Sequence, residues 1–161
     1  MDYQSFIQSK IVRQKENLNY TLNQWRFKKK KIVFTNGCFD ILHRGHVEYL
    51  AKAAELGDKL IIGLNTDSSV RRLKGENRPV NNEEARAILL SSLIFTDKII
   101  LFKEDTPLQL INFIQPDVLV KGSDYQPEEI AGYDIVKTKG GEVITIELTK
   151  GFSTTSILKK I

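Results

Sequence analysis

Short apolar runs recur along most of the chain, and a longer segment with apolar residues at helical spacing follows each of them. The runs predict five strands, over residues 31–36, 59–65, 98–102, 117–122 and 142–148. The second run is apolar almost throughout, which is typical of a strand buried on both faces of a parallel sheet. The pattern therefore favours a sheet whose strands alternate with helices.

The segments between the runs carry the signals of helices. We expect helices over residues 45–57, 81–93, 106–114, 127–140 (one or two short ones) and 153–161. Residues 3–25 also have apolar groups at helical spacing, so we expect one or two helices there, packed on the outside of the domain. The polar segment 66–80 is expected to be a loop.

The alternation predicts an α/β fold: a Rossmann-like, doubly wound, five-stranded parallel sheet with helices on both faces. We divide the chain into an N-terminal helical extension, residues 1–28, and one domain, residues 29–161. Ligands of such sheets bind at the carboxyl ends of the strands, where the strand order reverses. The polar segments that follow the strands are therefore predicted to share one site: 37–46, 66–78, 121–125 and 150–155.

Composition narrows the class of partner. The 161 residues suffice for one core, and the formal net charge of +4 suits nucleic acid or a phosphorylated small molecule. The basic run Lys28–Lys31 fits a solvated approach to the first strand better than a nucleic-acid patch, because no base-stacking motif accompanies it. No apolar run is long enough to cross a bilayer, and the single cysteine, Cys38, excludes an internal disulfide. We expect a cytoplasmic protein without nucleic-acid or membrane partners.

Both histidines of the chain lie three residues apart where the first strand leads into a helix, in the stretch FTNGCFDILHRGH. A helix N-terminus offers free N–H groups to a phosphate, and Gly45 lets the phosphate approach the backbone. Together with Asp40 the pair could instead form three metal ligands, but the H-E-x-x-H arrangement of a metalloprotease is missing. Capping a turn or filling a surface is the other alternative for His43 and His46.

Two motifs of the chain resemble those of a known family. Its first motif, G-x-F-D-x-x-H-x-G-H, is matched by Gly37, Phe39, Asp40, His43, Gly45 and His46. The stretch GFSTTSI, residues 151–157, resembles the I-S-T-T motif that opens the last helix in cytidylyltransferase-like members. The chain thus resembles the nucleotidyltransferase superfamily, and residues 29–161 are most similar to the adenylyltransferase domains of bacterial ADP-heptose synthases.

The resemblance implies the formation of ADP-heptose and pyrophosphate from D-glycero-β-D-manno-heptose 1-phosphate and ATP. It assigns stabilisation of the transition state to His43, His46 and Lys74. It assigns nucleotide binding to Thr35, Asn36, Gly37, Cys38, Phe39, Asp40, Gly45, Arg86, Gly122, Asp124, Ser153, Thr154 and Thr155. It assigns binding of the sugar phosphate to Asp67, Arg71, Arg72, Arg78 and Lys121. Mg²⁺ is expected to be held mainly by ATP phosphates and water.

Two of these residues keep alternatives. Asp40 orients its loop or assists the metal, or else it forms a turn or helix cap. Arg86 holds the nucleotide, or else it forms a surface ion pair with Glu83.

Rival functions also stay open from the sequence. One is a cytidylyltransferase for glycerol 3-phosphate or another alcohol or sugar phosphate, and one is a non-catalytic nucleotide-binding module. We expect a homo-oligomer, with a dimer favoured, and a separate heptose kinase in the same pathway.

Overall fold

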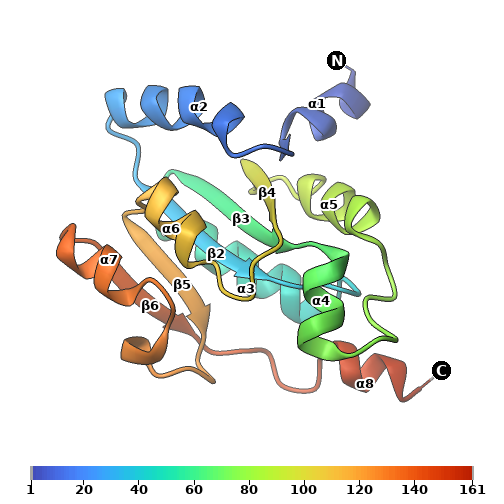
Figure 1. Ribbon diagram of the computed structural model, residues 1–161. Helices are drawn as coiled ribbons and strands as arrows, with labels where there is room; N and C mark the ends of the chain where they lie inside the picture. Colours follow the sequence, from blue (N-terminus) through green and yellow to red (C-terminus); the bar gives the residue numbers. More distant parts are fainter. Residues whose placement is uncertain (1, 161) are drawn as a thin grey trace.

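A single parallel sheet organises residues 2–160, the part of the chain that the computed structural model describes (Figure 1). Its strand order is β1-β4-β3-β2-β5-β6. The strands are β1 (Ile11–Val12), β2 (Ile32–Gly37), β3 (Lys59–Asn65), β4 (Lys98–Phe102), β5 (Val118–Gly122) and β6 (Glu142–Ile146). The predicted parallel α/β fold is confirmed, but the sheet has six strands and not five.

The additional strand comes from the segment that was predicted to be helical. In β1, Ile11 pairs with Ile99 and Val12 pairs with Ile100, so β1 extends the sheet beyond β4. A strand of two residues is too short to show the alternation that marks a strand in sequence. Only its pairing with β4, nearly ninety residues later in the chain, makes it a strand.

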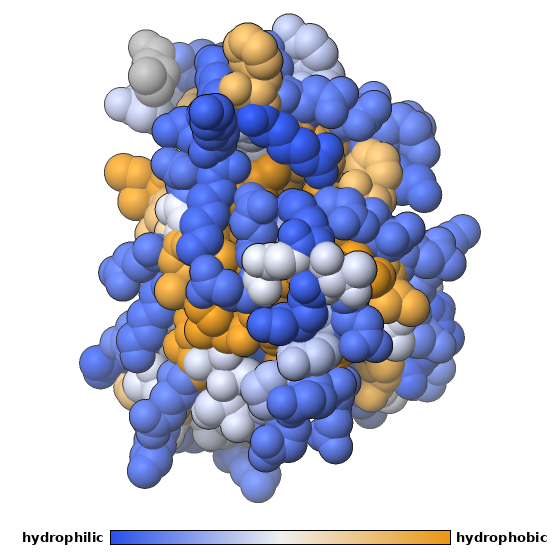
Figure 2. All heavy atoms as spheres, turned by 90° about the vertical axis from the view of Figure 1, so that its left-hand side faces the viewer, coloured by the Kyte–Doolittle hydropathy of each residue, from blue (hydrophilic) through white to orange (hydrophobic). Residues whose placement is uncertain are grey.

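Helices cover both faces of this sheet. They are α1 (Tyr3–Ser9), α2 (Glu16–Phe27), α3 (Arg44–Ala54), α4 (Asp67–Lys74), α5 (Glu83–Ser91), α6 (Leu108–Ile114), α7 (Tyr133–Thr138) and α8 (Thr154–Leu158), with a short 3₁₀ helix, η1 (Pro127–Glu129). In Figure 1, α6 and α7 lie in front of the sheet and α3 lies behind it. Figure 2 views the side that carries α6 and α7, where hydrophilic residues dominate and hydrophobic ones show between them.

Two hydrophobic clusters pack on opposite faces of the sheet. One contains Phe34 and Ile61 together with buried residues of α2, α6 and α7. The other contains Val33 and Ile62 together with buried residues of α3 and α5. Neighbouring strand residues thus point to opposite faces, which is the two-residue period expected of a strand buried on both sides.

Helix α4 lies where the sequence predicted a loop, and that prediction was wrong. Thr66 caps its first turn by accepting a hydrogen bond from the Ser69 N–H, and Gly75 ends it with a φ of 102°. The helix buries only Ser69 and Val70, so its apolar stripe was too thin to be recognised. The consequence for function is that Arg71, Arg72 and Lys74 are carried by a helix.

The strand order reverses between β2 and β5, since β3 and β4 continue on one side of β2 and β6 lies on the other side of β5. The carboxyl ends at this point are Gly37 and Gly122. Such a reversal leaves a crevice above the sheet, which is where open α/β sheets bind ligands. Within residues 2–160, no helix combines the length and the hydropathy needed to cross a membrane.

Candidate active site

The histidine pair sits where β2 gives way to α3. His43 is the N-cap of α3, and its Nδ1 accepts a hydrogen bond from the His46 N–H at 3.3 Å. The two rings stack with centroids 3.7 Å apart, and the ring of Phe39 meets the His46 ring edge-on at 5.1 Å. Capping and stacking therefore fix both imidazoles at the first turn of a helix, next to its free N–H groups.

Both imidazoles are neutral at neutral pH. Burial lowers the pKa of His43. Burial, and then the proximity of His43, lower the pKa of His46 to about 4. An incoming polyphosphate would oppose this effect, because nearby negative charge favours the protonated imidazole.

Gly45 allows the C-terminal motif to approach the histidines. A Cβ at this position would lie 3.1 Å from Cε1 of His43 and 3.3 Å from Cβ of Phe152. Such contacts are tighter than side chains normally make. The glycine therefore serves the packing of Phe152 as well as any approach of a phosphate to the backbone.

Arg44 also links the histidine motif to the C-terminal motif. Its guanidinium lies over the Phe152 ring at 5.1 Å, and its Nε donates to Glu48 at 2.6 Å. Glu48 also accepts from the hydroxyl of Thr149 at 2.5 Å. These contacts hold the segment before α8 against α3. Sequence reasoning missed them, although the spacing of Arg44 and Glu48, four apart on a helix, is a signal for their ion pair.

The serine and threonines of the second motif open α8. Ser153 and Ser156 form a capping box, in which each side chain accepts a hydrogen bond from the other residue's backbone N–H, at 3.0 and 3.1 Å. Thr154 is half-buried and Thr155 is exposed. The structure thus brings this helix start close to that of α3, as Gly45 and Phe152 show.

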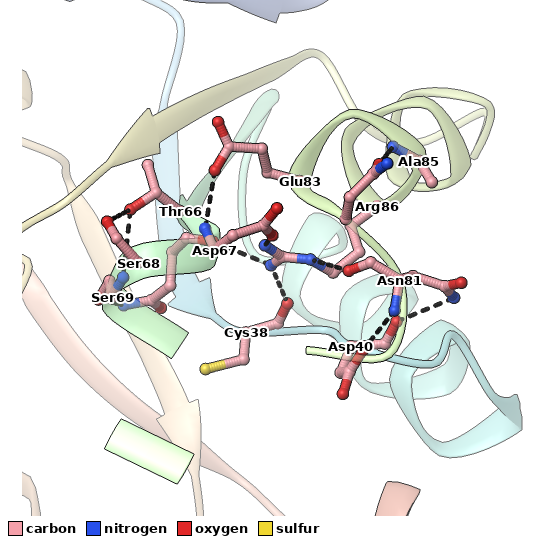
Figure 3. A network of polar contacts seen from close by, with 12 residues as sticks. Cys38, Asp40, Thr66, Asp67, Ser68, Ser69, Asn81, Glu83, Ala85 and Arg86 are labelled. Carbon is pink, nitrogen blue, oxygen red and sulfur yellow. Dashed lines mark hydrogen bonds and ion pairs between the residues drawn. The ribbon is translucent and has the colours of Figure 1, made fainter. Parts of the chain in front are cut away.

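Asp40 lies in the loop between β2 and α3, residues 38–43, which we call the histidine loop, and it is almost fully buried (Figure 3). One carboxylate oxygen accepts from the Arg78 guanidinium, and the other accepts from the N–H groups of Val80 at 2.7 Å and Asn81 at 3.0 Å. The contacts support the orientation of loops, since both oxygens accept from groups of the segment 78–81. Contact of Asp40 with the nucleotide stays a prediction.

Arg86 is buried in the same network, and the alternative ion pair with Glu83 is not formed (Figure 3). Its guanidinium pairs instead with Asp67 at 2.7 Å. Glu83 accepts a hydrogen bond from the N–H of Asp67 at 2.7 Å. Asp67, one of the predicted sugar-phosphate ligands, is therefore held by protein groups on both its backbone and its side chain.

The four cations predicted in the segment 66–78 differ in how far protein groups engage them. Arg72 pairs with Asp105 at 3.0 Å and also donates to the Lys103 carbonyl, so it is engaged with the segment that follows β4. Lys74 and Arg78 lie near Cys38, where their charge partly offsets the effect of burial, which raises the pKa of the thiol. Lys74 is exposed at the end of α4. Arg71, also on α4, is exposed as well.

Near the carboxyl ends of β2 and β5, Lys121 is a poorly satisfied cation. Its Nζ donates to the Asn36 carbonyl at 3.4 Å and lies 5.4 Å from the centre of the Tyr125 ring. Burial lowers its pKa, an effect that Asp124 opposes. Within the described residues the buried Oδ1 of Asn36 has no hydrogen-bond partner. A donor and an acceptor are thus available side by side at the ligand-binding edge.

Two further predicted residues have structural tasks at this edge. The hydroxyl of Thr35 bonds to that of Tyr49 at 2.8 Å in the interior. Thr35 is fully buried, so it supports the strand end from below. Gly122 leaves room for Asp124, because a Cβ there would lie 2.5 Å from Oδ1 of that aspartate.

The fold and this site define a class: a doubly wound α/β protein with a histidine-bearing helix start facing a hydroxyl-bearing one. The chain matches the model of the cytidylyltransferase-like family over residues 34–160 and belongs to that family. This confirms the resemblance inferred from the two motifs.

Curated relatives narrow the comparison. The chain is 61% identical over 133 residues to the bifunctional protein HldE of Campylobacter concisus, covering 83% of this chain and 27% of that protein. It is 53% identical over 153 residues to HldE of Nitrobacter winogradskyi, covering 95% and 31%. The chain therefore spans less than a third of these relatives.

Two solved structures are similar. The lipopolysaccharide core biosynthesis protein from Thermoplasma volcanium is 30% identical, with a TM-score of 0.62 over 76% of this chain and 99% of that one. Pantoate-β-alanine ligase from Francisella tularensis has a TM-score of 0.64 over 94% and 72%, and at 16% identity it supports the fold alone.

Proposed function

We propose that the chain transfers the adenylyl group of ATP to D-glycero-β-D-manno-heptose 1-phosphate, forming ADP-heptose and pyrophosphate. An oxygen of the sugar phosphate attacks the α-phosphorus of ATP. The bond from that phosphorus to the oxygen bridging the α- and β-phosphates breaks, and pyrophosphate leaves with that oxygen. The chemistry needs alignment of two anions and stabilisation of charge, and it needs no covalent intermediate on the protein.

The observation that carries this proposal is the meeting of two helix starts, one with stacked histidines and one with a row of hydroxyls. Ring stacking of His43 and His46 and the approach of Phe152 to Gly45 place them together. Free N–H groups at helix starts bind phosphate. The high identity to proteins named HldE supports the heptose substrate, and so does the likeness to a lipopolysaccharide core biosynthesis protein.

In this mechanism the histidine pair binds the triphosphate and donates hydrogen bonds to the oxygens that gain charge as pyrophosphate departs. Lys74, exposed at the end of α4, approaches the same phosphates. Ser153, Thr154 and Thr155 bind the β- and γ-phosphates at the start of α8. Gly37, Cys38 and Asn36 let the nucleotide approach the end of β2, while Gly122 and Asp124 border it from β5. Lys121, Arg71 and Arg78 are proposed to bind the sugar phosphate.

Mg²⁺ is proposed to accompany ATP and to neutralise charge on its phosphates. Within residues 2–160, no three His, Cys, Asp or Glu side chains come together as a metal site. The protein's contribution is then to hold the phosphates that carry the ion.

The proposed reaction implies a biological setting. A heptose kinase activity must supply the sugar 1-phosphate, and we propose that this chain acts in the cytoplasm as a homodimer.

The test is pyrophosphate release with Mg²⁺ and each of ATP, CTP, GTP and UTP, against heptose 1-phosphate and glycerol 3-phosphate. Turnover with ATP and heptose 1-phosphate is expected. Turnover with CTP and glycerol 3-phosphate alone would instead identify a cytidylyltransferase, which the family match makes the second candidate. ATP binding without turnover in any pairing would favour a non-catalytic module.

A variant separates the chemistry from the fold. His46→Ala is expected to lower pyrophosphate release by about a hundredfold or more, because a group that stabilises transition-state charge is lost. Circular dichroism should show an unchanged fold. Near-normal turnover of a folded His46→Ala protein would contradict the role of the histidine.

A further inference from the structure

The Arg86 guanidinium joins three segments that surround the histidine loop (Figure 3). Its side chain is 0% exposed. Nη1 donates to the carbonyls of Cys38 at 2.6 Å and Asn65 at 2.9 Å. Nη2 donates to Asp67 at 2.7 Å, and Nε donates to the Asn81 carbonyl at 3.0 Å. One planar cation thus ties the ends of β2 and β3 to the start of α5.

This arrangement leaves Arg86 little capacity for a ligand. A guanidinium has five N–H donors in one plane, and four of them are directed at protein acceptors. Charge-assisted bonds are stronger and more directional than neutral ones. A buried cation that lacked these partners would be strongly destabilising. One N–H of Arg86 remains, but its side chain is 0% exposed, so contact with a nucleotide would require the surrounding segments to move apart.

The histidine loop is held at a second point by Asp40. Asn81 takes part in both connections: its carbonyl accepts from Arg86, while its N–H and its side-chain amide donate to Asp40. The bonded positions Cys38 and Asp40 lie only a few residues before His43. A loop so short, fixed at two points by buried bonds, has little freedom to place the next residues elsewhere.

We propose that Arg86 is a positioning residue, which sets the path of the loop between β2 and α3 and through it the places of His43 and His46, without touching the nucleotide. The inference rests on the proposed function only where turnover is measured. Lysine cannot replace Arg86, since it offers a single point charge and not a planar fork.

The first experiment reads the histidines directly. The chain has only two histidines, so labelled imidazole resonances report on this site alone. Arg86→Lys is expected to shift the ring resonances of both. Arg26→Lys is the matched control, because Arg26 also donates to a backbone carbonyl, that of Ile114, but in α2. Unshifted histidine resonances in a folded Arg86→Lys protein would overturn the proposal, whether or not the chain is an adenylyltransferase.

The second experiment separates positioning from nucleotide contact. For a positioning residue, Arg86→Lys lowers kcat tenfold or more and shifts the resonances of both histidines, and any weakening of the ATP Kd accompanies that shift because the displaced histidines bind the triphosphate. A residue that binds nucleotide gives the opposite result, an ATP Kd weakened tenfold or more with unmoved histidine resonances. That result would overturn the proposal. Absence of turnover in the wild-type chain would count against the proposed function alone.

Arg86→Lys could fail to fold, so a milder variant is needed. Asp67→Asn keeps the shape of the Arg86 partner and removes its charge, at a side chain that is 22% exposed. We expect a smaller shift of the same histidine resonances. A folded Asp67→Asn protein with wild-type resonances and wild-type kcat would contradict the coupling.

Discussion

At the scale of single residues, the site depends on an imidazole kept neutral by its surroundings. His46 packs between the rings of His43 and Phe39, and burial is the main reason that its pKa falls to about 4. A neutral histidine costs little to bury, whereas a charged one would lose its hydration. The free protein thus keeps the pair uncharged at neutral pH.

The buried histidine predicts a pH-dependent stability. An unfolded histidine has a pKa near 6.5, so between about pH 6.5 and pH 4 the unfolded chain binds a proton that the folded chain does not. Stability is therefore complete above pH 6.5 and is lost as the pH falls towards 4, by up to about 3 kcal/mol. His46→Gln should remove this part of the loss.

Urea unfolding of both proteins at about pH 5 and about pH 7 provides the measurement. Carboxylates titrate in both proteins, so their contribution to the loss of stability cancels when the two proteins are compared. If His46→Gln loses as much stability as the wild type on acidification, the histidine is not buried in its neutral form.

At the scale of elements, the site is formed by the N-termini of several helices. His43, Thr66, Asn82 and Ser153 each cap a helix by accepting from a backbone N–H in its first turn. Three of these caps directly follow strand ends or their loops, so the free N–H groups of the helices gather along one edge of the sheet. The sequence predicted helices at three of the four starts, over residues 45–57, 81–93 and 153–161, and it missed α4 because that helix buries so little apolar surface.

Two substitutions distinguish the capping of α8 by Ser153 from direct binding of ATP by its hydroxyl. Ser153→Ala removes the capping box, and we expect faster amide exchange over Thr154–Leu158 and a raised KM for ATP, because the phosphate-facing N–H groups are no longer held. Ser153→Asn, which can still cap, should restore most of the protection. A KM that stays raised in Ser153→Asn with restored protection would mean that the hydroxyl itself binds ATP.

At the scale of the whole molecule, the N-terminal residues share the core of the sheet. Leu18 and Leu22 of α2 are buried in the same cluster as Phe34 and Ile61. β1 adds its two residues to the edge of β4. The amphipathic spacing in residues 3–25 was visible in the sequence, but the surface that it covers was not, because that surface is made by distant strands.

Truncation of a core side chain in this segment is expected to destabilise the entire chain. Leu22→Ala should lower the free energy of unfolding by about 2–5 kcal/mol, the usual effect of emptying a well-packed site. Tyr20→Ala, at a residue 72% exposed on the same helix, is the control and should stay within about 0.5 kcal/mol. Denaturant unfolding checks both. A Leu22→Ala effect as small as the control, or a separate early transition, would indicate that the segment is only loosely attached.

The sequence by itself determined the parallel α/β class, the five longer strands and the segments that meet at the carboxyl edge. These follow from local patterns, since apolar period, caps and glycine positions lie within a few residues of one another. It also placed both histidines at a helix start, and its two motifs indicated the family that the comparisons confirm.

Only the tertiary structure decided the rest, because the partners are remote in the chain. Arg86 reaches the Cys38 carbonyl across 48 positions, and Glu48 reaches Thr149 across 101. Which buried donor meets which acceptor depends on how strands and helices pack, and no local pattern records it. The structure thus engages Arg86 and Asp40 with protein groups, turns a predicted loop into α4, and adds β1 to the sheet.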